Sequence, residues 1–514
     1  MKSVKKSRAR SQAKSVHTTR TTEYDVVVIG GGFGGLSAAA LLAKDGKKVV
    51  VLEKNAVLGG RANVLKAKGF QFDMGPSWYM MPDVFEKFFA EFGKKPADYL
   101  DLVKLNPQYR IIFPDKTHVD MLPNLEHNKA VFEKIEKGAG QRLQDYLDEA
   151  RVKYELSVRT VLYKNIDSIF DFFSWDLLKN GKMLRPFDSM QKYVAEFFTS
   201  EKLQQIIQFT LVFLGGAPHN MPALYSLISH VDFTMHTFYP MGGMSEVVKS
   251  FVKIGTEYGV KYQTETPVLE IITEGQKITG VRTKDGVIKT KAVVANADMA
   301  HVERLFTDQN LRMYDEKYWQ NRTFAPSAFL MYLGVKGKVA GLEHHNIFFG
   351  KNWIEHFKEI FEKPSWPKDP SVYLNVPSIT DPSVAPKGQH TVMILVPVAC
   401  GLEETQASKE KYGEYILQYL EEKAGIKLKD KIVYKSIFSV SDFASTYNSY
   451  AGNALGGVAH TLMQTGPFRP PNKHKKISNL FFSGAGTVPG IGVPSAVISG
   501  HLVRERLKKY EKNT

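Results

Sequence analysis

The stretch EYDVVVIGGGFGGLSAAALLAKDGKKVVVLEKN, residues 23–55, decides the fold of this chain. A β-branched run that ends at Ile29 is typical of a strand buried on both faces of a sheet. A glycine turn follows it, then an Ala- and Leu-rich stretch over residues 36–44 that reads as a helix, and residues 49–52 repeat the buried-strand pattern. This order predicts a βαβ unit.

The glycine turn has the spacing Gly30-x-Gly32-x-x-Gly35. The first glycine makes the tight turn, the second lets a pyrophosphate approach the backbone, and the third lets helix and strand pack closely. Glu53 ends the second strand, where an acid accepts hydrogen bonds from a ribose and repels a 2′-phosphate. The pattern predicts a dinucleotide site, but it does not separate a nicotinamide from a flavin.

Two further glycine turns follow this unit. LGGRA places Gly60 and Arg61 soon after the second strand, and FQFDMGPSWY contains the turn 75–77. Adjacent glycines allow close backbone approach, and an arginine is a fixed cation for a phosphate or a ring.

Composition excludes several classes of protein. The 514 residues are 43% hydrophobic and 24% charged, which excludes a wholly disordered chain, a collagen-like chain and a simple coiled coil. The only cysteine, Cys400, cannot form a disulfide framework, an iron–sulfur cluster or a cysteine-based zinc site. No window of about 18 apolar residues is present, so we expect no membrane-spanning helix.

The net charge of +15 is concentrated partly at the ends of the chain. The first 22 residues are basic and contain no acid or apolar core, which excludes a secretory signal and favours a disordered tail. An organelle-targeting peptide or an arm for anionic lipid remains an alternative. A second basic run spans residues 504–512. No nucleic-acid-binding motif accompanies these charges, so we expect no nucleic-acid partner.

Strand and helix patterns alternate unevenly along the chain. Residues 127–235 look mostly helical and are rich in aromatics, residues 260–298 look like a β-meander, and the last residues read as strand, glycine loop and helix. Because nucleotide-binding patterns lie at both ends, we expect a discontinuous nucleotide domain that closes over a substrate domain. The predicted segments are a basic tail (1–22), nucleotide-binding segments (23–125, 241–300 and 471–514), a helical region facing substrate and membrane (126–240), and the rest of the substrate domain (301–470).

These motifs together resemble the carotenoid (phytoene) desaturase family, bacterial and fungal type, within the FAD-dependent amine-oxidase-like flavoproteins. The resemblance covers nearly all of residues 24–509 and includes VVVIGGGFGGLSAA, VLEKNAVLGGRA, FDMGPSW, YPMGGM, VVANAD, PFRPPN and SGAGTVPGIGVPSAVISG. It implies an α/β fold with a Rossmann-like FAD-binding domain and a discontinuous substrate domain, made of a β-sheet and a helical, membrane-facing subdomain.

The resemblance also implies the residues that bind FAD. They are Gly30, Gly32, Phe33, Gly34, Gly35, Glu53, Lys54, Gly60, Arg61, Gly75, Pro76, Ser77, Val268, Asn296, Gly484, Gly486, Val493, Pro494 and Ser495. A separate physical argument supports the last three, because Pro494 suits the first turn of a helix and the positive end of that helix would stabilise a reduced flavin. Where many relatives carry an acid in the preceding loop, this chain has Thr487.

The aromatic region suits a long apolar substrate that comes from a membrane. Its aromatics serve as the core of a helical subdomain or as the wall of an apolar tunnel, and its basic residues interleave with them as in an interfacial helix. We expect a peripheral, cytoplasmic protein with monotopic membrane contact. The residues concerned are Phe170, Phe172, Phe173, Trp175, Lys179, Lys182, Arg185, Phe187, Tyr193, Phe197, Phe198, Phe209 and Phe213.

The sequence does not identify the group that accepts the substrate's proton. His219, Asp232 and His236 are the candidates, although each also suits a structural role. His344 and His345 are adjacent, and neighbouring strand side chains point to opposite faces, so we expect no metal there.

The resemblance implies that the chain dehydrogenates phytoene in several steps toward lycopene, passing hydride to FAD and then electrons to a quinone or oxygen. Related enzymes are alternatives: a diapophytoene or hydroxycarotenoid desaturase, a carotenoid oxidase, an isomerase or a retinol saturase. A protein of another class, a prenyl-lipid escort protein, uses a related fold without redox chemistry.

Overall fold

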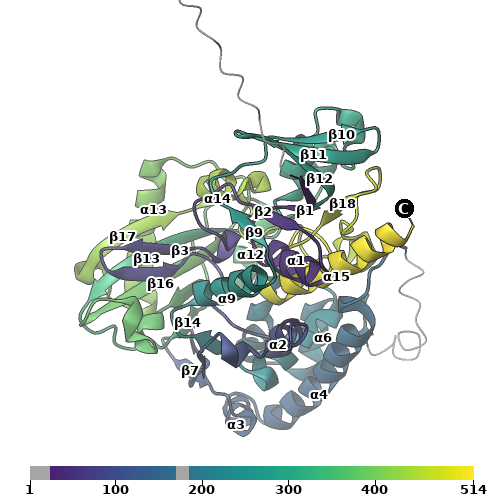
Figure 1. Ribbon diagram of the computed structural model, residues 1–514. Helices are drawn as coiled ribbons and strands as arrows, with labels where there is room; N and C mark the ends of the chain where they lie inside the picture. Colours follow the sequence, from purple (N-terminus) through teal and green to yellow (C-terminus); the bar gives the residue numbers. More distant parts are fainter. Residues whose placement is uncertain (1–22, 169–183, 514) are drawn as a thin grey trace, which may run out of the picture.

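A computed structural model describes residues 23–168 and 184–513 of the chain (Figure 1). The predicted basic tail lies outside the described residues. The same is true of much of the predicted interfacial helix, namely Phe170, Phe172, Phe173, Trp175, Lys179 and Lys182.

One sheet carries the nucleotide-binding motifs. Its strands are β1 (Glu23–Ile29), β2 (Val49–Leu52), β9 (Lys261–Gln263), β10 (Glu270–Glu274), β11 (Lys277–Thr283), β12 (Gly286–Ala295) and β18 (Leu480–Phe482). β1 lies between β2 and β12 and is parallel to both. Residues 293–295 of β12 pair with β18, and residues 286–289 of β12 pair with the antiparallel strand β11. The carboxyl ends of β1, β12 and β18 therefore meet at one edge.

Helices from both ends of the chain cover this sheet. They are α1 (Phe33–Lys44) and α15 (Val493–Lys512), and Figure 1 shows the yellow α15 beside the purple α1. A helix from the middle of the chain, α9 (Met244–Glu257), packs against α1. The Ser37 hydroxyl donates to the carbonyl of Val497 at 2.9 Å. A Cβ on Gly500 would lie 2.4 Å from the Ser37 oxygen, so only a glycine lets the two helices approach this closely. The first and last segments thus form one unit.

A second sheet has the order β17-β13-β16-β15-β14-β6-β7. Its strands are β6 (Tyr109–Ile112), β7 (His118–Met121), β13 (Ser327–Lys336), β14 (His345–Phe348), β15 (Val372–Asn375), β16 (Gln389–Val398) and β17 (Ile432–Phe438). All pairs are antiparallel except β14 with β6. β6 and β7 lie before residue 125, the predicted end of the first nucleotide-binding segment. They nevertheless belong to the second sheet, because β6 pairs with β14. The segment boundaries otherwise stay a prediction.

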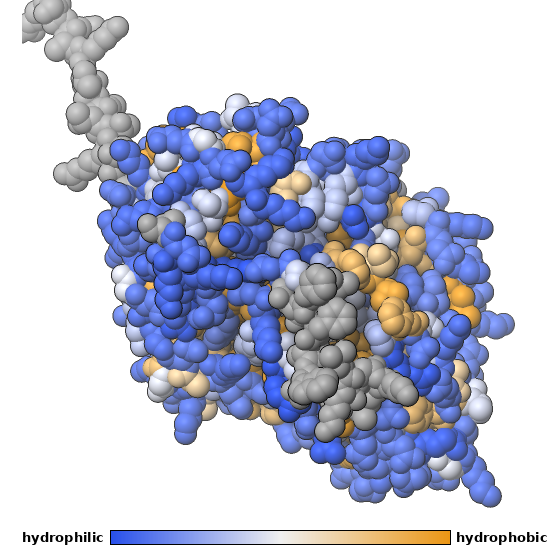
Figure 2. Space-filling model, turned by 90° about the vertical axis from the view of Figure 1, so that its right-hand side faces the viewer, coloured by the Kyte–Doolittle hydropathy of each residue, from blue (hydrophilic) through white to orange (hydrophobic). Residues whose placement is uncertain are grey.

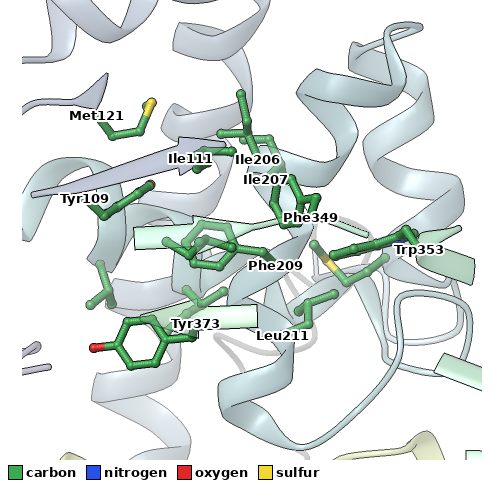
Figure 3. Close-up of a cluster of buried hydrophobic side chains, with 14 of the residues drawn as sticks. Tyr109, Ile111, Met121, Ile206, Ile207, Phe209, Leu211, Phe349, Trp353 and Tyr373 are labelled. Atoms are coloured by element: carbon green, nitrogen blue, oxygen red, sulfur yellow. The ribbon is translucent and has the colours of Figure 1, made fainter. Parts of the chain in front are cut away.

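A helical region packs against one face of the second sheet and occupies the lower part of Figure 1. Its helices are α3 (Leu125–Ile135), α4 (Ala139–Ser157), α6 (Met190–Phe197), α7 (Glu201–Gln208) and α8 (Leu227–His230). Figure 3 shows the core between helices and sheet, where Ile206, Phe209 and Leu211 meet Ile111 and Phe349. Much of the predicted aromatic region is therefore core, and its contact with a membrane stays a prediction.

Further strands and α-helices complete the described part of the chain. They are β3 (Val64–Ala67), β4 (Phe70–Asp73), β5 (Leu102–Lys104), β8 (Phe238–Pro240), α2 (Pro82–Ala90), α10 (Met299–Arg304), α11 (Glu316–Gln320), α12 (Trp353–Phe361), α13 (Gln406–Tyr419) and α14 (Val440–Tyr447). Within residues 23–168 and 184–513, none of the helices has the length and apolar character needed to cross a bilayer.

Candidate active site

The glycine turn between β1 and α1 leaves no room for side chains. Gly30 adopts a φ of +99°, which favours glycine. A Cβ on Gly34 would lie 2.5 Å from the backbone nitrogen of Gly484, and a Cβ on Gly35 would lie 2.3 Å from the Gly30 oxygen. Gly30, Gly32 and Gly34 line a cavity, whereas Gly35 packs behind the turn. The turn is thus a backbone cradle of the kind that a pyrophosphate needs.

Glu53 lies at the end of β2 beside this cradle and is buried. Its Oε2 accepts from the Gly31 amide at 2.8 Å, and its Oε1 accepts from the Asn55 amide at 2.9 Å. Each oxygen keeps a further lone pair, which leaves capacity for a ribose hydroxyl. The Lys54 ammonium instead donates to the carbonyl of Ser445 at 2.7 Å, so its charge is directed toward α14.

Asn296 joins the two ends of the chain at this edge. Its Nδ2 donates to the Gly30 carbonyl at 3.3 Å, and its Oδ1 accepts from the Ser483 hydroxyl at 3.4 Å. The Gly484 amide donates to Ser499 on α15 at 2.7 Å, and this glycine has a φ of +94°. The predicted C-terminal residues therefore reach the same cavity as the N-terminal turn.

Arg61 supplies a cation to the middle of the cavity. One of its terminal nitrogens donates to the carbonyl of Asn453 at 3.2 Å and to the Ser449 hydroxyl. Its buried Nε has no partner among the described residues. Burial lowers the pKa of Arg61, which Asp298 partly offsets. An unpaired guanidinium N–H beside a glycine cradle fits a cofactor with phosphates, as FAD has.

The turn after β4 lies where the cradle meets the substrate side. A Cβ on Gly75 would lie 2.6 Å from the Arg61 oxygen, so the turn packs directly on the arginine. The Ser77 hydroxyl lies 2.7 Å from the hydroxyl of Tyr373 on β15. The Trp78 ring stacks on His345, with ring centroids 4.2 Å apart.

The predicted FAD residues surround one cavity of about 1120 Å³. Of the residues predicted to bind FAD, all except Gly35 line it. They include Val268, which is buried, and Val493, Pro494 and Ser495 at the start of the 20-residue helix α15. The direct contacts of these residues with FAD stay a prediction, but their convergence from four distant parts of the sequence fits that cofactor.

The same cavity continues over the second sheet. One row of neighbouring strand residues lines it, from Ile347 on β14 to Tyr373 on β15, Leu395 on β16 and Leu330 on β13. The helical region closes the other side with Phe209 and other aromatic and aliphatic side chains. This half is an apolar channel continuous with the cradle.

Two phenylalanines mark where the cavity opens. Phe187 and Phe468 both line it, although their side chains are 87% and 44% exposed. Met463, which lies shortly before Phe468 in the sequence, is also exposed. Figure 2 shows apolar side chains gathered on one face of the molecule.

The three proton-acceptor candidates do not line the cavity in the part of the chain that is described. Asp232 is buried behind it and accepts from the Tyr109 hydroxyl at 2.8 Å, and burial raises the pKa of Asp232 to about 7. His219 is partly exposed and lies 3.5 Å from Glu362 in a separate small pocket. Burial lowers the pKa of His236. The structure does not bring the three together at the reacting end.

A buried polar group of Asn375, His345 and Tyr373 lies closer to the cavity, and of these residues the sequence singled out only His345. Asn375 donates through Nδ2 to the His344 carbonyl at 3.3 Å and to His345 Nδ1 at 3.2 Å, so that nitrogen is an acceptor. Tyr373 then donates to the same nitrogen at 2.8 Å. Burial holds the pKa of His345 well below its usual range, so its ring is neutral. Tyr373 is the member of this group that faces the cavity.

Comparison with known proteins agrees with this geometry. The family described as flavin containing amine oxidoreductase matches residues 33–506. A carotenoid 3,4-desaturase of Haloarcula japonica is 46% identical over 94% of this chain and 98% of its own length. A zeta-carotene-forming phytoene desaturase of Myxococcus xanthus is 34% identical over 94% of each. The chain belongs to the carotenoid desaturase family. It is an FAD-dependent oxidoreductase that acts on CH–CH groups.

Solved structures confirm the predicted fold class. An oxidoreductase from Methanosarcina mazei superposes with a TM-score of 0.62 at 20% identity, covering 94% of this chain and 100% of that chain. A putrescine oxidase double mutant gives 0.58 at 15% identity, covering 95% and 99%. A Rab GDI from Plasmodium falciparum gives 0.53 at 13% identity, covering 95% and 98%. At these identities the likeness shows the fold alone.

Proposed function

We propose that this carotenoid desaturase takes a linear carotenoid along the apolar half of its cavity to the FAD end. The observation that carries the proposal is the row of Ile347, Tyr373, Leu395 and Leu330, which makes one wall continuous with the glycine cradle. A polyene offers no polar group to recognise, so its binding comes from buried area at about 25 cal/mol per Å². FAD, when bound, supplies the hydride acceptor.

The residues of the chain then hold the substrate and exclude water. A CH group must come within about 3–3.5 Å of the flavin for hydride transfer, and close packing along the channel is what would hold it there. Tyr373 and Trp78 are placed where the apolar channel meets the cradle. We propose that they position the reacting carbons.

We propose 3,4-desaturation as the reaction, with the stepwise desaturation of phytoene toward lycopene as the second candidate. The relative named carotenoid 3,4-desaturase is 46% identical, against 34% for the zeta-carotene-forming phytoene desaturase. The 3,4 bond lies near the end of a carotenoid, so this reaction needs one end of the carotenoid at the flavin. Phytoene desaturation needs more central bonds there.

Expression in carotenoid-producing bacteria tests the choice. Three host strains accumulate phytoene, lycopene, or lycopene with hydroxylated ends, and chromatography identifies the pigment formed. Added double bonds in either lycopene-type strain, with phytoene unchanged, support 3,4-desaturation. Consumption of phytoene supports the second candidate, and no new double bond in any strain contradicts both. A cradle variant, Gly34→Ala, is the matched control.

We propose that the exposed Phe187 and Phe468 lie in a lipid surface, so that the substrate passes from the bilayer into the cavity. Linear carotenoids are almost insoluble in water, and exposed aromatics at an opening are typical of interfacial proteins. The reduced cofactor would pass its electrons to a quinone or to oxygen. Anaerobic turnover with a quinone added to the liposomes would identify the quinone, and turnover only in air would identify oxygen.

The fold shared with Rab GDI would by itself also allow a prenyl-lipid escort protein, but the carotenoid desaturase relatives favour the enzyme. The cradle also opposes an escort protein, since Gly34 and Gly35 leave no room for a Cβ and the Arg61 Nε–H has no partner within residues 23–168 and 184–513. An escort protein would purify colourless, whereas the proposed enzyme would purify yellow.

A further inference from the structure

Arg469 is a buried cation that pairs with no carboxylate in the described part of the chain. Its side chain is 3% exposed. All three of its donating nitrogens bind backbone carbonyls: Nη2 donates to Ala485 at 2.8 Å, Nη1 to Val458 at 3.0 Å and Nε to Thr487 at 3.1 Å. Within residues 23–168 and 184–513 no acid forms an ion pair with it, and apart from the three carbonyls the groups that favour its charge are Tyr225 and Tyr318.

Burial lowers the pKa of Arg469 to about 10, which still leaves it charged at neutral pH. An unpaired buried charge costs several kcal/mol, so an ordinary structural role would be better filled by a neutral side chain. The other buried arginine near α15 shows the ordinary solution, because Arg506 pairs with Asp167. Among residues 23–168 and 184–513, no acid supplies the negative partner that would offset the charge of Arg469.

The loop that Arg469 holds lies against the FAD cavity. Ala485, Gly486 and Val488 line the cavity, and Arg469 does not, so the loop separates the guanidinium from the cofactor site by one thickness of backbone. Gly457 packs on the same side as Arg469, because a Cβ there would lie 2.6 Å from the Ala485 oxygen and 3.0 Å from Nη2.

Arg469 also fixes the direction of two amides in this loop. A trans peptide is planar, and its N–H points opposite to its carbonyl. With the carbonyls of Ala485 and Thr487 turned toward Arg469, the amides of Gly486 and Val488 are turned away from it, toward the cavity. Neither amide donates to a carbonyl in the described part of the chain. They are free to donate to an acceptor in the cavity.

We infer that Arg469 is a positioning residue that raises the reduction potential of FAD in this protein. Two-electron reduction adds negative charge to the flavin ring system, and a fixed cation behind the loop, together with two amides turned toward the cavity, would favour the reduced form of a bound FAD. The inference rests on FAD as cofactor and not on the identity of the carotenoid, so failure of the substrate assignment leaves it standing.

Three variants of the FAD-loaded protein test the inference by spectroelectrochemical titration. Arg469→Gln keeps a hydrogen-bond donor and removes the charge; we expect the affinity for reduced FAD to fall at least tenfold relative to oxidised FAD, which for two electrons is a drop of about 30 mV. Arg469→Lys keeps the charge but loses the planar guanidinium. We expect the ratio of its affinities for reduced and oxidised FAD to stay within threefold of the wild-type ratio, and its affinity for FAD to be weaker. Arg110→Gln removes an arginine paired with Asp120 on β6–β7 and should change neither.

Two results would overturn the inference. One is an unchanged potential in Arg469→Gln. The other is a fall in Arg469→Lys larger than tenfold, because a retained charge would then not retain the potential. The second result is decisive even if Arg469→Gln does not retain FAD. The FAD dissociation constant of each oxidised variant, measured by fluorescence, separates a loss of loop order from a loss of charge.

Discussion

The two halves of the cavity are built in different ways. The cradle half is made of backbone, where Gly34 and Gly484 approach so closely that a single Cβ does not fit. The channel half is made of side chains, with Ile347, Leu395 and Leu330 contributed by three strands of one sheet. A backbone site tolerates almost no substitution, whereas a side-chain wall accepts changes that keep volume and polarity.

This difference follows from what each half must bind. A dinucleotide has charged phosphates and ribose hydroxyls at fixed spacing, so fixed amides and one acid such as Glu53 suit it. A polyene is a long apolar rod, and only shape and buried area distinguish one section of it from another. We therefore expect cradle variants to lose the cofactor and channel variants to keep it while losing the substrate.

The largest effect is expected from Gly34→Ala. Its Cβ would lie 2.5 Å from the Gly484 nitrogen and 2.8 Å from the Gly484 Cα, and backbone cannot move aside cheaply. We expect almost complete loss of bound FAD, measured as flavin released on denaturation per mole of protein. Gly46→Asn is the control, because nothing lies within 4 Å of a Cβ at that left-handed position and asparagine tolerates it. Full FAD content in Gly34→Ala would contradict the cradle assignment.

The cradle could be predicted from sequence because the glycines of its first turn lie close together in the sequence. Each of them also has its own steric reason to be a glycine. Two of the predicted residues have a different local role. Gly35 packs against the Gly30 oxygen instead of lining the cavity, and the Lys54 ammonium binds the Ser445 carbonyl. A motif predicts that a residue belongs to the turn, but it does not say which atoms face the ligand.

The channel could not be predicted in the same way, because its wall exists only after the strands pair. Ile347, Tyr373 and Leu395 are far apart in sequence and become neighbours through the register of β14, β15 and β16. Among the channel residues, the aromatic pattern of the sequence found Phe209 and Phe213. Trp78 directly follows the predicted 75–77 turn, and that adjacency was a signal that could have found it.

The proton-acceptor candidates lie away from the cavity for a related reason. Asp232 is a candidate because it titrates, yet its carboxyl is buried behind the cavity against Tyr109. Titratable residues near a motif in sequence need not face the site, and only packing decides which side they point to.

The second-largest effect is expected from Leu395→Asp. An unpaired carboxylate in the apolar wall costs several kcal/mol once a polyene covers it, so we expect carotenoid conversion to fall about a hundredfold. FAD content should stay at the wild-type level, since Leu395 lies in the channel half. Conversion is measured by pigment chromatography, with Leu395→Met as the control that keeps volume and polarity. Loss of FAD together with activity would mean that the two halves are not separable.

A smaller effect is expected from the paired change Phe187→Ser and Phe468→Ser at the opening. Removing two aromatics from a lipid interface should weaken binding to liposomes about tenfold or more, because burying one such side chain is worth about 1.5–3 kcal/mol. FAD content should not change. Flotation with vesicles measures the binding, and Val433→Ser, an exposed position on β17, is the control. Equal flotation of both variants would place the membrane contact elsewhere on the surface.

The smallest effect is expected from Tyr373→Phe, which lies where the two halves meet. The change removes the hydroxyl between Ser77 and His345 Nδ1, while Asn375 still donates to that nitrogen. We therefore expect a loss of about 1–2 kcal/mol in the free energy of unfolding, full FAD content and a several-fold fall in conversion. Tyr419→Phe is the control, because its buried hydroxyl donates to Asp369 away from the cavity. If both variants lose the same stability and only Tyr373→Phe loses activity, Tyr373 positions the substrate; if both keep full activity, its hydroxyl serves packing alone.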